Sequence, residues 1–152
     1  GYYGEKERAA SQLLPPPKNF IQAKYDFIDE MLKFGQFDVS SKPLQILDVG
    51  CGIGGTSRYL AKKFGQDTTV VGITLSQNQV NRATALAKEQ DVPNARFEVM
   101  DALDMTFPDN SFDYVWACES GEHMPDKKKY VEQMTRVLKP GGRIVIATWC
   151  QR

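Results

Sequence analysis

The residues best placed to do chemistry lie in one glycine-rich stretch of the chain, Asp48-Val49-Gly50-Cys51-Gly52-Ile53-Gly54-Gly55. An apolar run at 44–47 precedes it, and residues 56–61 after it have the pattern of a helix. A strand that turns through closely spaced glycines into a helix lets backbone approach a ligand, and the helix offers N–H groups that its own backbone leaves unpaired. The stretch therefore predicts a cofactor-binding loop, with a turn that binds nothing as the alternative.

Two features narrow the class of cofactor. Glycines at 50, 52 and 55 fit the dinucleotide fingerprint, but 71–74 lacks the acidic residue that binds a nicotinamide ribose. Asp48 ends a buried strand, where ionisation of a carboxylate requires compensating donors or a nearby cation. These features favour a cofactor with an ammonium and a sulfonium over one with a pyrophosphate.

Composition excludes several classes of partner and site. The chain has 152 residues, 41% of them hydrophobic, which is enough for one core. Its 19 Lys and Arg balance its 19 Asp and Glu, so nothing suggests the basic surface that nucleic acid requires. With one histidine, and three cysteines that form no C-x-x-C pair, we expect no metal site and free thiols in a reducing compartment. No apolar run reaches membrane-spanning length.

Alternating strands and helices must position these residues. Such alternation is typical of a Rossmann-like, doubly wound parallel α/β sheet with right-handed crossovers. The strand at 96–99 has one more polar face, which predicts a position near a sheet edge. The expected strands are 44–47, 69–73, 96–99, 112–117 and 144–149, and the expected helices are 18–34, 56–64, one capped by Ser76 and Gln79, and one from Pro125 to Leu138.

Ligands bind to such sheets outside the carboxyl ends of the strands, at the topological switch point. Four groups would meet there. They are Asp48 with the glycine loop, Thr74 with Leu75, Asp101 with Ala102, and Cys118 with Glu119.

Three motifs, taken together, resemble the class I S-adenosylmethionine-dependent methyltransferases. The stretch at 48–54 resembles the first motif of that family, 107–113 resembles the segment before its fourth strand, and 138–142 resembles the turn before its fifth. Within the class, the stretches at 72–76, 119–127 and 148–150 are most similar to the gamma-tocopherol methyltransferase group. That group includes relatives that act on prenylated phenols or quinols and related alkaloid N-methyltransferases.

The resemblance implies a role for each cofactor-binding residue. Gly50 and Gly52, with Cys51 between them, would lie against the methionine part of S-adenosylmethionine, and Asp48 would orient its amino group.

The other cofactor contacts lie farther along the chain. Thr74 and Leu75 would hold the ribose, where most family members have an acid. Asp101 would accept a hydrogen bond from the adenine amino group, with Ala102 beside it, and Cys118 would lie at the end of the fourth strand. S-adenosylhomocysteine would be the product.

Methyl transfer from a sulfonium requires in-line positioning of a nucleophile and, for a phenol, removal of a proton. His123 is the best candidate base, with Glu119 or Glu122 in reach. A histidine that only caps the following helix is the alternative. The cysteines are expected to pack at strand ends and not to act as nucleophiles.

The function implied is methyl transfer to an aromatic carbon of a small prenylated phenol. The alternatives are N- or O-methylation of an alkaloid, sterol or sugar-like acceptor, and a cofactor-binding fragment without turnover. An oxidoreductase is disfavoured by Thr74. The compartment is expected to be the cytoplasm or a plastid.

The domain organisation follows from the same resemblance. Residues 1–17 would form a cofactor-covering segment and a proline-rich connector, and 18–152 an S-adenosylmethionine-binding core. Five strands are expected, with the C-terminal strand pair of the family missing. The fifth strand would then be an exposed edge, through which a homodimer or strand exchange could form.

Overall fold

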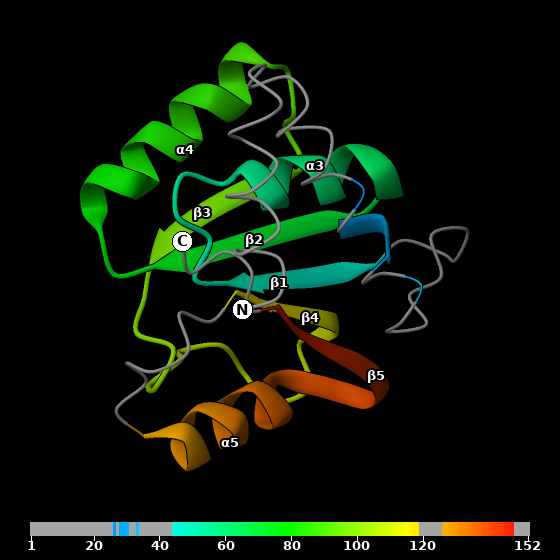
Figure 1. Ribbon diagram of the computed structural model, residues 1–152, viewed down its shortest axis with the longest axis vertical. Coiled ribbons are helices and arrows are strands. Elements are labelled where there is room, and N and C mark those ends of the chain that lie inside the picture. The colour runs from blue at the N-terminus through cyan, green and yellow to red at the C-terminus, as the bar shows by residue number, and fades with distance from the viewer. Residues whose placement is uncertain (1–25, 27, 31–32, 34–43, 119–125, 148–152) are drawn as a thin grey trace, which may run out of the picture.

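The computed structural model of the protein describes residues 26, 28–30, 33, 44–118 and 126–147 (Figure 1). Its five strands form one parallel sheet in the order β3-β2-β1-β4-β5. The α/β prediction is therefore confirmed, including the edge position of β3. The elements are β1 (Gln45–Val49), α3 (Gly55–Phe64), β2 (Thr69–Thr74), α4 (Gln77–Glu89), β3 (Ala95–Val99), β4 (Phe112–Cys118), α5 (Lys127–Val137) and β5 (Leu138–Ala147).

The sheet is buried on both faces because its strands are apolar at successive positions. In β4, Tyr114 and Trp116 belong to one buried cluster, whereas Val115 and Ala117 belong to the other. The first cluster includes side chains of α3 and α4, and the second includes those of α5. Helices therefore cover both faces, as a doubly wound sheet requires (Figure 1).

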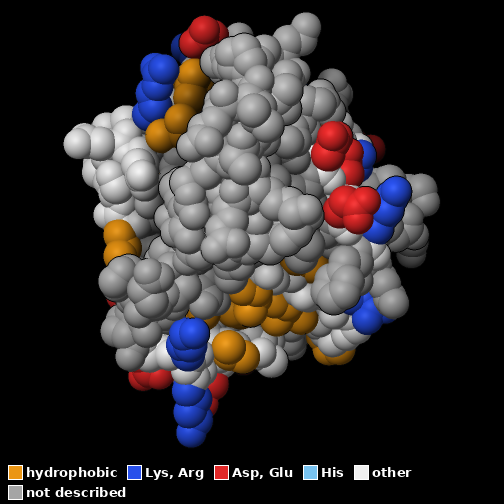
Figure 2. Space-filling view, in the orientation of Figure 1, with side chains coloured by type: hydrophobic (Ala, Val, Ile, Leu, Met, Phe, Trp, Pro, Cys, Tyr) orange, Lys and Arg blue, Asp and Glu red, His pale blue; other side chains and the backbone are white. Residues whose placement is uncertain are grey.

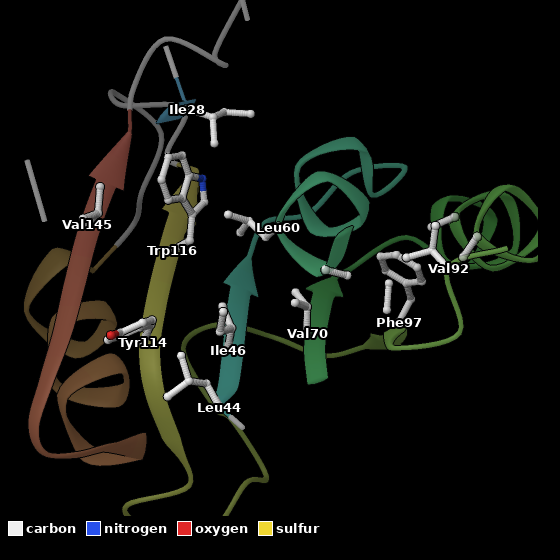
Figure 3. Packing of buried hydrophobic residues seen from close by; sticks show 14 of the residues in the cluster. Ile28, Leu44, Ile46, Leu60, Val70, Val92, Phe97, Tyr114, Trp116 and Val145 are labelled. Atoms are coloured by element: carbon white, nitrogen blue, oxygen red, sulfur yellow. The ribbon is translucent and has the colours of Figure 1, made fainter. Parts of the chain in front are cut away.

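Trp116 belongs to the first cluster and is 1% exposed. Figure 3 shows its ring beside Ile28, with Leu60 of α3 nearby. Ile28 is fully buried and is one of the helical residues at 26–33 that the structure describes. Asp29, next to it, accepts a 2.7 Å hydrogen bond from the Tyr59 hydroxyl. The described N-terminal helical residues thus contact α3 through both apolar packing and a hydrogen bond.

Two expected boundaries near the C-terminal end differ from the structure. Helix α5 begins at Lys127 with Asp126 as its N-cap, not at Pro125, because the Asp126 side chain accepts from the Lys129 N–H. Strand β5 begins at Leu138, so the Lys139-Pro140-Gly141-Gly142 segment expected as a turn lies within it as an irregularity. Gly141 there has φ 82°, which glycine adopts readily.

The capping box predicted at Ser76 and Gln79 is half right. The Ser76 hydroxyl accepts from the Gln79 N–H at 3.2 Å, as expected for an N-cap. The reciprocal bond is replaced, because the Gln79 side chain accepts from Thr74 at 2.6 Å. Residue 79 therefore joins the start of α4 to the end of β2.

Several predictions fall outside the described residues. They are the segment 1–17, most of the helix 18–34, and the last two residues of the strand 144–149. Within the described chain, no helix is both long and apolar enough to cross a membrane.

Candidate functional site

The glycine loop after β1 is held in left-handed backbone. Gly50, Gly52 and Gly54 have φ values of 75°, 58° and 84°, which side chains other than glycine rarely adopt. The N–H groups of Gly50 and Cys51 both donate to the Ile73 carbonyl of β2, at 3.0 and 2.9 Å. The start of the loop is therefore hydrogen-bonded to the neighbouring strand. The left-handed backbone of the loop requires its glycines.

Asp48 lies under this loop and is 1% exposed. In the sheet it is aligned with Gly72 of β2 and Trp116 of β4. Its Oδ2 accepts a 2.6 Å hydrogen bond from the Ser57 hydroxyl of α3. Because a buried carboxylate is stabilised by donors and by cations, Asp48 is a candidate for contact with a positively charged ligand group at the loop.

The Cys51 thiol is half-buried in the same loop. Burial, together with the nearby Asp48 carboxylate, raises its pKa from 9.0 to about 12, while the Arg58 guanidinium opposes the shift. At neutral pH the thiol stays protonated, so it lacks the thiolate that nucleophilic chemistry requires. The expectation that Cys51 packs and does not act as a nucleophile is consistent with this environment.

Gly72 is a site residue that the sequence analysis did not single out. A Cβ at this position would lie 2.8 Å from both the Cys51 Cβ and the Ser57 Oγ. Only glycine lets β2 approach the loop and α3 this closely. The signal was a lone glycine inside a strand pattern, which often marks close backbone approach.

The predicted ribose side is built from the end of β2 and the start of α4. The Thr74 hydroxyl donates to Gln79 Oε1 at 2.6 Å and accepts from the Ser76 N–H at 3.4 Å. Its one proton is thus engaged, whereas the Gln79 amide group keeps its donors. Leu75 beside them is 72% exposed. The geometry makes Gln79, which sequence reasoning assigned only to a cap, a further candidate for contact with ribose hydroxyls.

The predicted adenine side follows β3. Asp101 is exposed, and its Oδ1 accepts from the Leu103 N–H at 2.8 Å, which closes a short turn. The second carboxylate oxygen can accept another bond. Ala102 is partly buried against the cluster that includes Met105. The turn therefore presents a carboxylate next to an apolar surface, a combination suited to an aromatic amine.

The remaining predicted residues lie at the end of β4 or beyond it. Cys118 is the last residue of β4 and is paired with Ala147. The candidate catalytic residues Glu119 and His123, and Glu122, lie outside the described residues. Among the residues that are described, no group of His, Cys, Asp and Glu could hold a metal ion.

The described residues fit S-adenosylmethionine. Asp48 would supply buried negative charge for its ammonium, and a Cβ built on Gly52 meets no atom within 4 Å, so ligand atoms can approach the backbone there. Asp101 would supply an acceptor for its adenine amino group. The parallel register of β1, β2 and β3 brings these groups to one edge of the sheet.

The chain is similar to proteins of a known family. The chain matches the model of a methyltransferase domain over residues 46–142. It is 48% identical over 152 residues to a 2-methyl-6-phytyl-1,4-hydroquinone methyltransferase of Synechocystis, a match covering 100% of this chain and 44% of that protein. It is 51% identical over 135 residues to the chloroplastic tocopherol O-methyltransferase of Arabidopsis thaliana, covering 86% of this chain and 38% of that protein. The chain spans less than half the length of these relatives.

Solved structures with the same fold include two that overlap most of the described core. The cyclase SpnF superposes with a TM-score of 0.73 at 32% identity, covering 82% of this chain and 44% of that one. An S-adenosylmethionine-dependent methyltransferase from Aquifex aeolicus superposes with a TM-score of 0.68 at 25% identity, covering 78% of this chain and 61% of that one. The chain therefore belongs to the family of S-adenosylmethionine-dependent methyltransferase domains.

Proposed function

We propose that this protein transfers a methyl group from S-adenosylmethionine to an aromatic carbon of a prenylated hydroquinone or related phenol. One observation carries the choice of acceptor, namely 48% identity along this whole chain to a methyltransferase named for a phytyl hydroquinone. The tocopherol methyltransferase of Arabidopsis, named for a prenylated phenol, supports the same acceptor class.

The cofactor would lie across the carboxyl edge of the sheet. Asp48 would orient the ammonium, the backbone at Gly50 to Gly52 would line the methionine chain, and Asp101 would accept from the adenine amino group. Thr74, with Leu75 and Gln79, would contact the ribose. When bound, the cofactor supplies an activated methyl group on a positively charged sulfur. The chain's contribution is to fix this sulfur against the acceptor and to exclude water.

The acceptor requires a base. A hydroquinone has a pKa near that of a phenol, about 10, so an adjacent base raises the fraction of the more nucleophilic phenolate at neutral pH. We propose His123, assisted by Glu119, for this role, on the strength of their positions after β4. A phenolate is nucleophilic at its ring carbons and at its oxygen, so the orientation of the ring decides between C- and O-methylation.

Product analysis tests the proposal. The protein expressed from its complete reading frame is incubated with S-adenosylmethionine and a prenylated hydroquinone, and the product is analysed by mass spectrometry and NMR. A new aromatic C–CH₃ group supports the proposal, and an aryl methyl ether would move the assignment to O-methylation. Cofactor binding without a methylated product from phenolic, alkaloid or sterol acceptors would contradict turnover and favour a binding role.

We further propose that β5 is a contact edge between two copies of the chain. It is the last strand of the described sheet, and Ile146 on it is 40% exposed. Figure 2 shows hydrophobic side chains gathered over this part of the molecule. Among the described strands, β5 has β4 as its one neighbour, and such an edge readily accepts another strand. Light scattering across a concentration series tests this, and a strictly monomeric chain would contradict it.

For localisation, the proposal is a plastid, since the Arabidopsis relative is named as chloroplastic. Imaging of a tagged full-length protein provides the test, and a cytoplasmic signal would overturn it.

A further inference from the structure

Arg58 is a buried charged residue with no place yet in the proposed function. It lies in the first part of α3 and is 7% exposed. Burial of a guanidinium is costly unless strong hydrogen bonds and opposite charge surround it.

Two hydrogen bonds of Arg58 reach the glycine loop. Its guanidinium Nη1 donates to the Ile53 carbonyl at 2.5 Å, and its backbone N–H donates to the Gly54 carbonyl at 2.9 Å. The Gly54 N–H in turn donates to the Cys51 carbonyl at 2.9 Å. Both sides of the peptide group between Ile53 and Gly54 are therefore fixed, one by the arginine side chain.

This peptide would otherwise rotate easily. Gly54 has φ 84°, and glycine populates alternative backbone conformations at low energetic cost. Rotation would turn the Ile53 carbonyl from α3 toward the ligand side of the loop. A carbonyl oxygen facing the carboxylate of a bound amino-acid group repels it, whereas N–H groups attract it.

The donors of the loop show where such a group would bind. The N–H groups of Gly50, Cys51 and Gly54 are used by the Ile73 and Cys51 carbonyls. Among the described residues, those of Gly52 and Ile53 donate to no acceptor. The loop thus has a buried anion, Asp48, at its start and a buried cation, Arg58, beyond its end. A zwitterion with its ammonium toward Asp48 matches this order of charges.

We propose that Arg58 is a positioning residue that holds the Ile53 carbonyl inward, so that the glycine loop accepts the amino-acid end of S-adenosylmethionine. The inference rests on the proposed cofactor binding and assigns different parts of the cofactor to different residues. Arg58 acts on the methionine part, and the ribose and adenine contacts at Gln79 and Asp101 are independent of it.

Two ligands separate this role from a purely structural one. S-adenosylhomocysteine carries the amino-acid end, whereas 5′-methylthioadenosine has the same ribose and adenine without it. Calorimetric titration compares both ligands on the wild-type chain, Arg58→Met, Arg58→Lys and, as a matched control, Arg82→Met on the exposed face of α4. Thermal unfolding is measured for each variant.

In Arg58→Met we expect S-adenosylhomocysteine to bind about tenfold more weakly, since a charge-assisted hydrogen bond is lost. The affinity for 5′-methylthioadenosine should change by less than about twofold, because that ligand does not reach the loop end. Arg58→Lys should recover part of the loss by restoring a cationic donor, and Arg82→Met should leave both affinities unchanged.

Equal weakening of the two ligands, or no weakening of either, would overturn the positioning role. If Arg58→Met does not remain folded, the two ligands are compared on Arg58→Lys. An equal change in both affinities of that variant would also contradict the positioning role. Failure of the wild-type chain to bind either ligand would instead contradict the proposed function and is distinguishable on that ground.

Discussion

The two sides of the candidate cofactor site are held in different ways. The loop side consists of Asp48, the glycine loop at 50–54 and Arg58, and both charged residues are less than 10% exposed. The rim side consists of Thr74, Leu75, Gln79 and Asp101, whose hydrogen bonds in the structure are short-range contacts between residues close in sequence. Leu75 and Asp101 are exposed.

Because of this difference, we expect substitutions on the loop side to lower both the stability of the fold and cofactor affinity. Substitutions on the rim side should lower cofactor affinity alone. Loop residues contact β2, α3 and β3, so a change there disturbs the core. Rim residues lie at the end of β2, at the start of α4 and in the turn after β3, and all of them are partly or fully exposed. Surface substitutions of this kind usually change stability by less than about 0.5 kcal/mol. Four substitution experiments test this contrast.

The largest effect is expected from Gly54→Ala on the loop side. A Cβ there would lie 2.6 Å from the Phe97 ring and 3.1 Å from the Ala83 Cβ, at φ 84°. Overpacking and left-handed strain together should lower the free energy of unfolding by about 3 kcal/mol and abolish cofactor binding. Urea denaturation and calorimetry measure both.

Gly52→Ala is the matched control. It has φ 58°, but its Cβ meets nothing within 4 Å, so strain alone should lower the free energy of unfolding by about 1 kcal/mol. Equal losses of stability in the two variants would argue against close packing as the reason for Gly54.

On the rim side, Asp101→Asn should lower affinity for S-adenosylmethionine about tenfold without loss of stability. The asparagine oxygen can still accept from the Leu103 N–H, while its amide nitrogen cannot accept from the adenine amino group. Titration calorimetry and thermal unfolding are the measurements. A variant that loses stability as well as affinity would break the proposed separation of the two sides.

Gln79→Met should weaken cofactor binding about fivefold, because it removes the amide donors proposed to contact the ribose. Thr74→Val should have a smaller effect, since the Thr74 hydroxyl proton is already engaged with Gln79. Gln77→Met, whose side chain contacts Asn81 in the same helix, serves as the control. A larger loss in Thr74→Val than in Gln79→Met would restore threonine as the main ribose contact.

The smallest effect concerns the pH dependence of stability. The pKa of Cys51 is raised to about 12 in the folded chain from an ordinary value of 9.0. Between these values the unfolded chain loses the thiol proton and the folded chain keeps it, so stability is unaffected below the lower value and falls as the pH rises above it.

The comparison is between the wild type and Cys51→Ala. Relative to that variant, the free energy of unfolding of the wild type should fall by about 0.8 kcal/mol between neutral pH and about pH 9.5. Denaturant unfolding at pH 7.5 and 9.5 measures it. Parallel pH profiles would show that burial does not hold the thiol in its protonated form.

The fold and the loop could be predicted because their signals are local. Periodicity located the strands and the helices among the described residues, and the glycine spacing after an apolar run located the loop. The boundaries at Pro125 and at residues 139–142 were less accurate, because α5 is fixed by the Asp126 cap and β5 by pairing of Leu138 with Phe112.

The sequence by itself determined the order of elements, the parallel sheet and the residues at the carboxyl ends of its strands, since these depend on alternation of apolar residues and on the handedness of crossovers. Only the tertiary structure decided that Arg58 holds the Ile53 carbonyl, that Gln79 bonds Thr74, and that Gly72 must lack a side chain beside Ser57. These features arise from side-chain direction and from contacts between segments brought together by folding, which spacing along the chain does not encode.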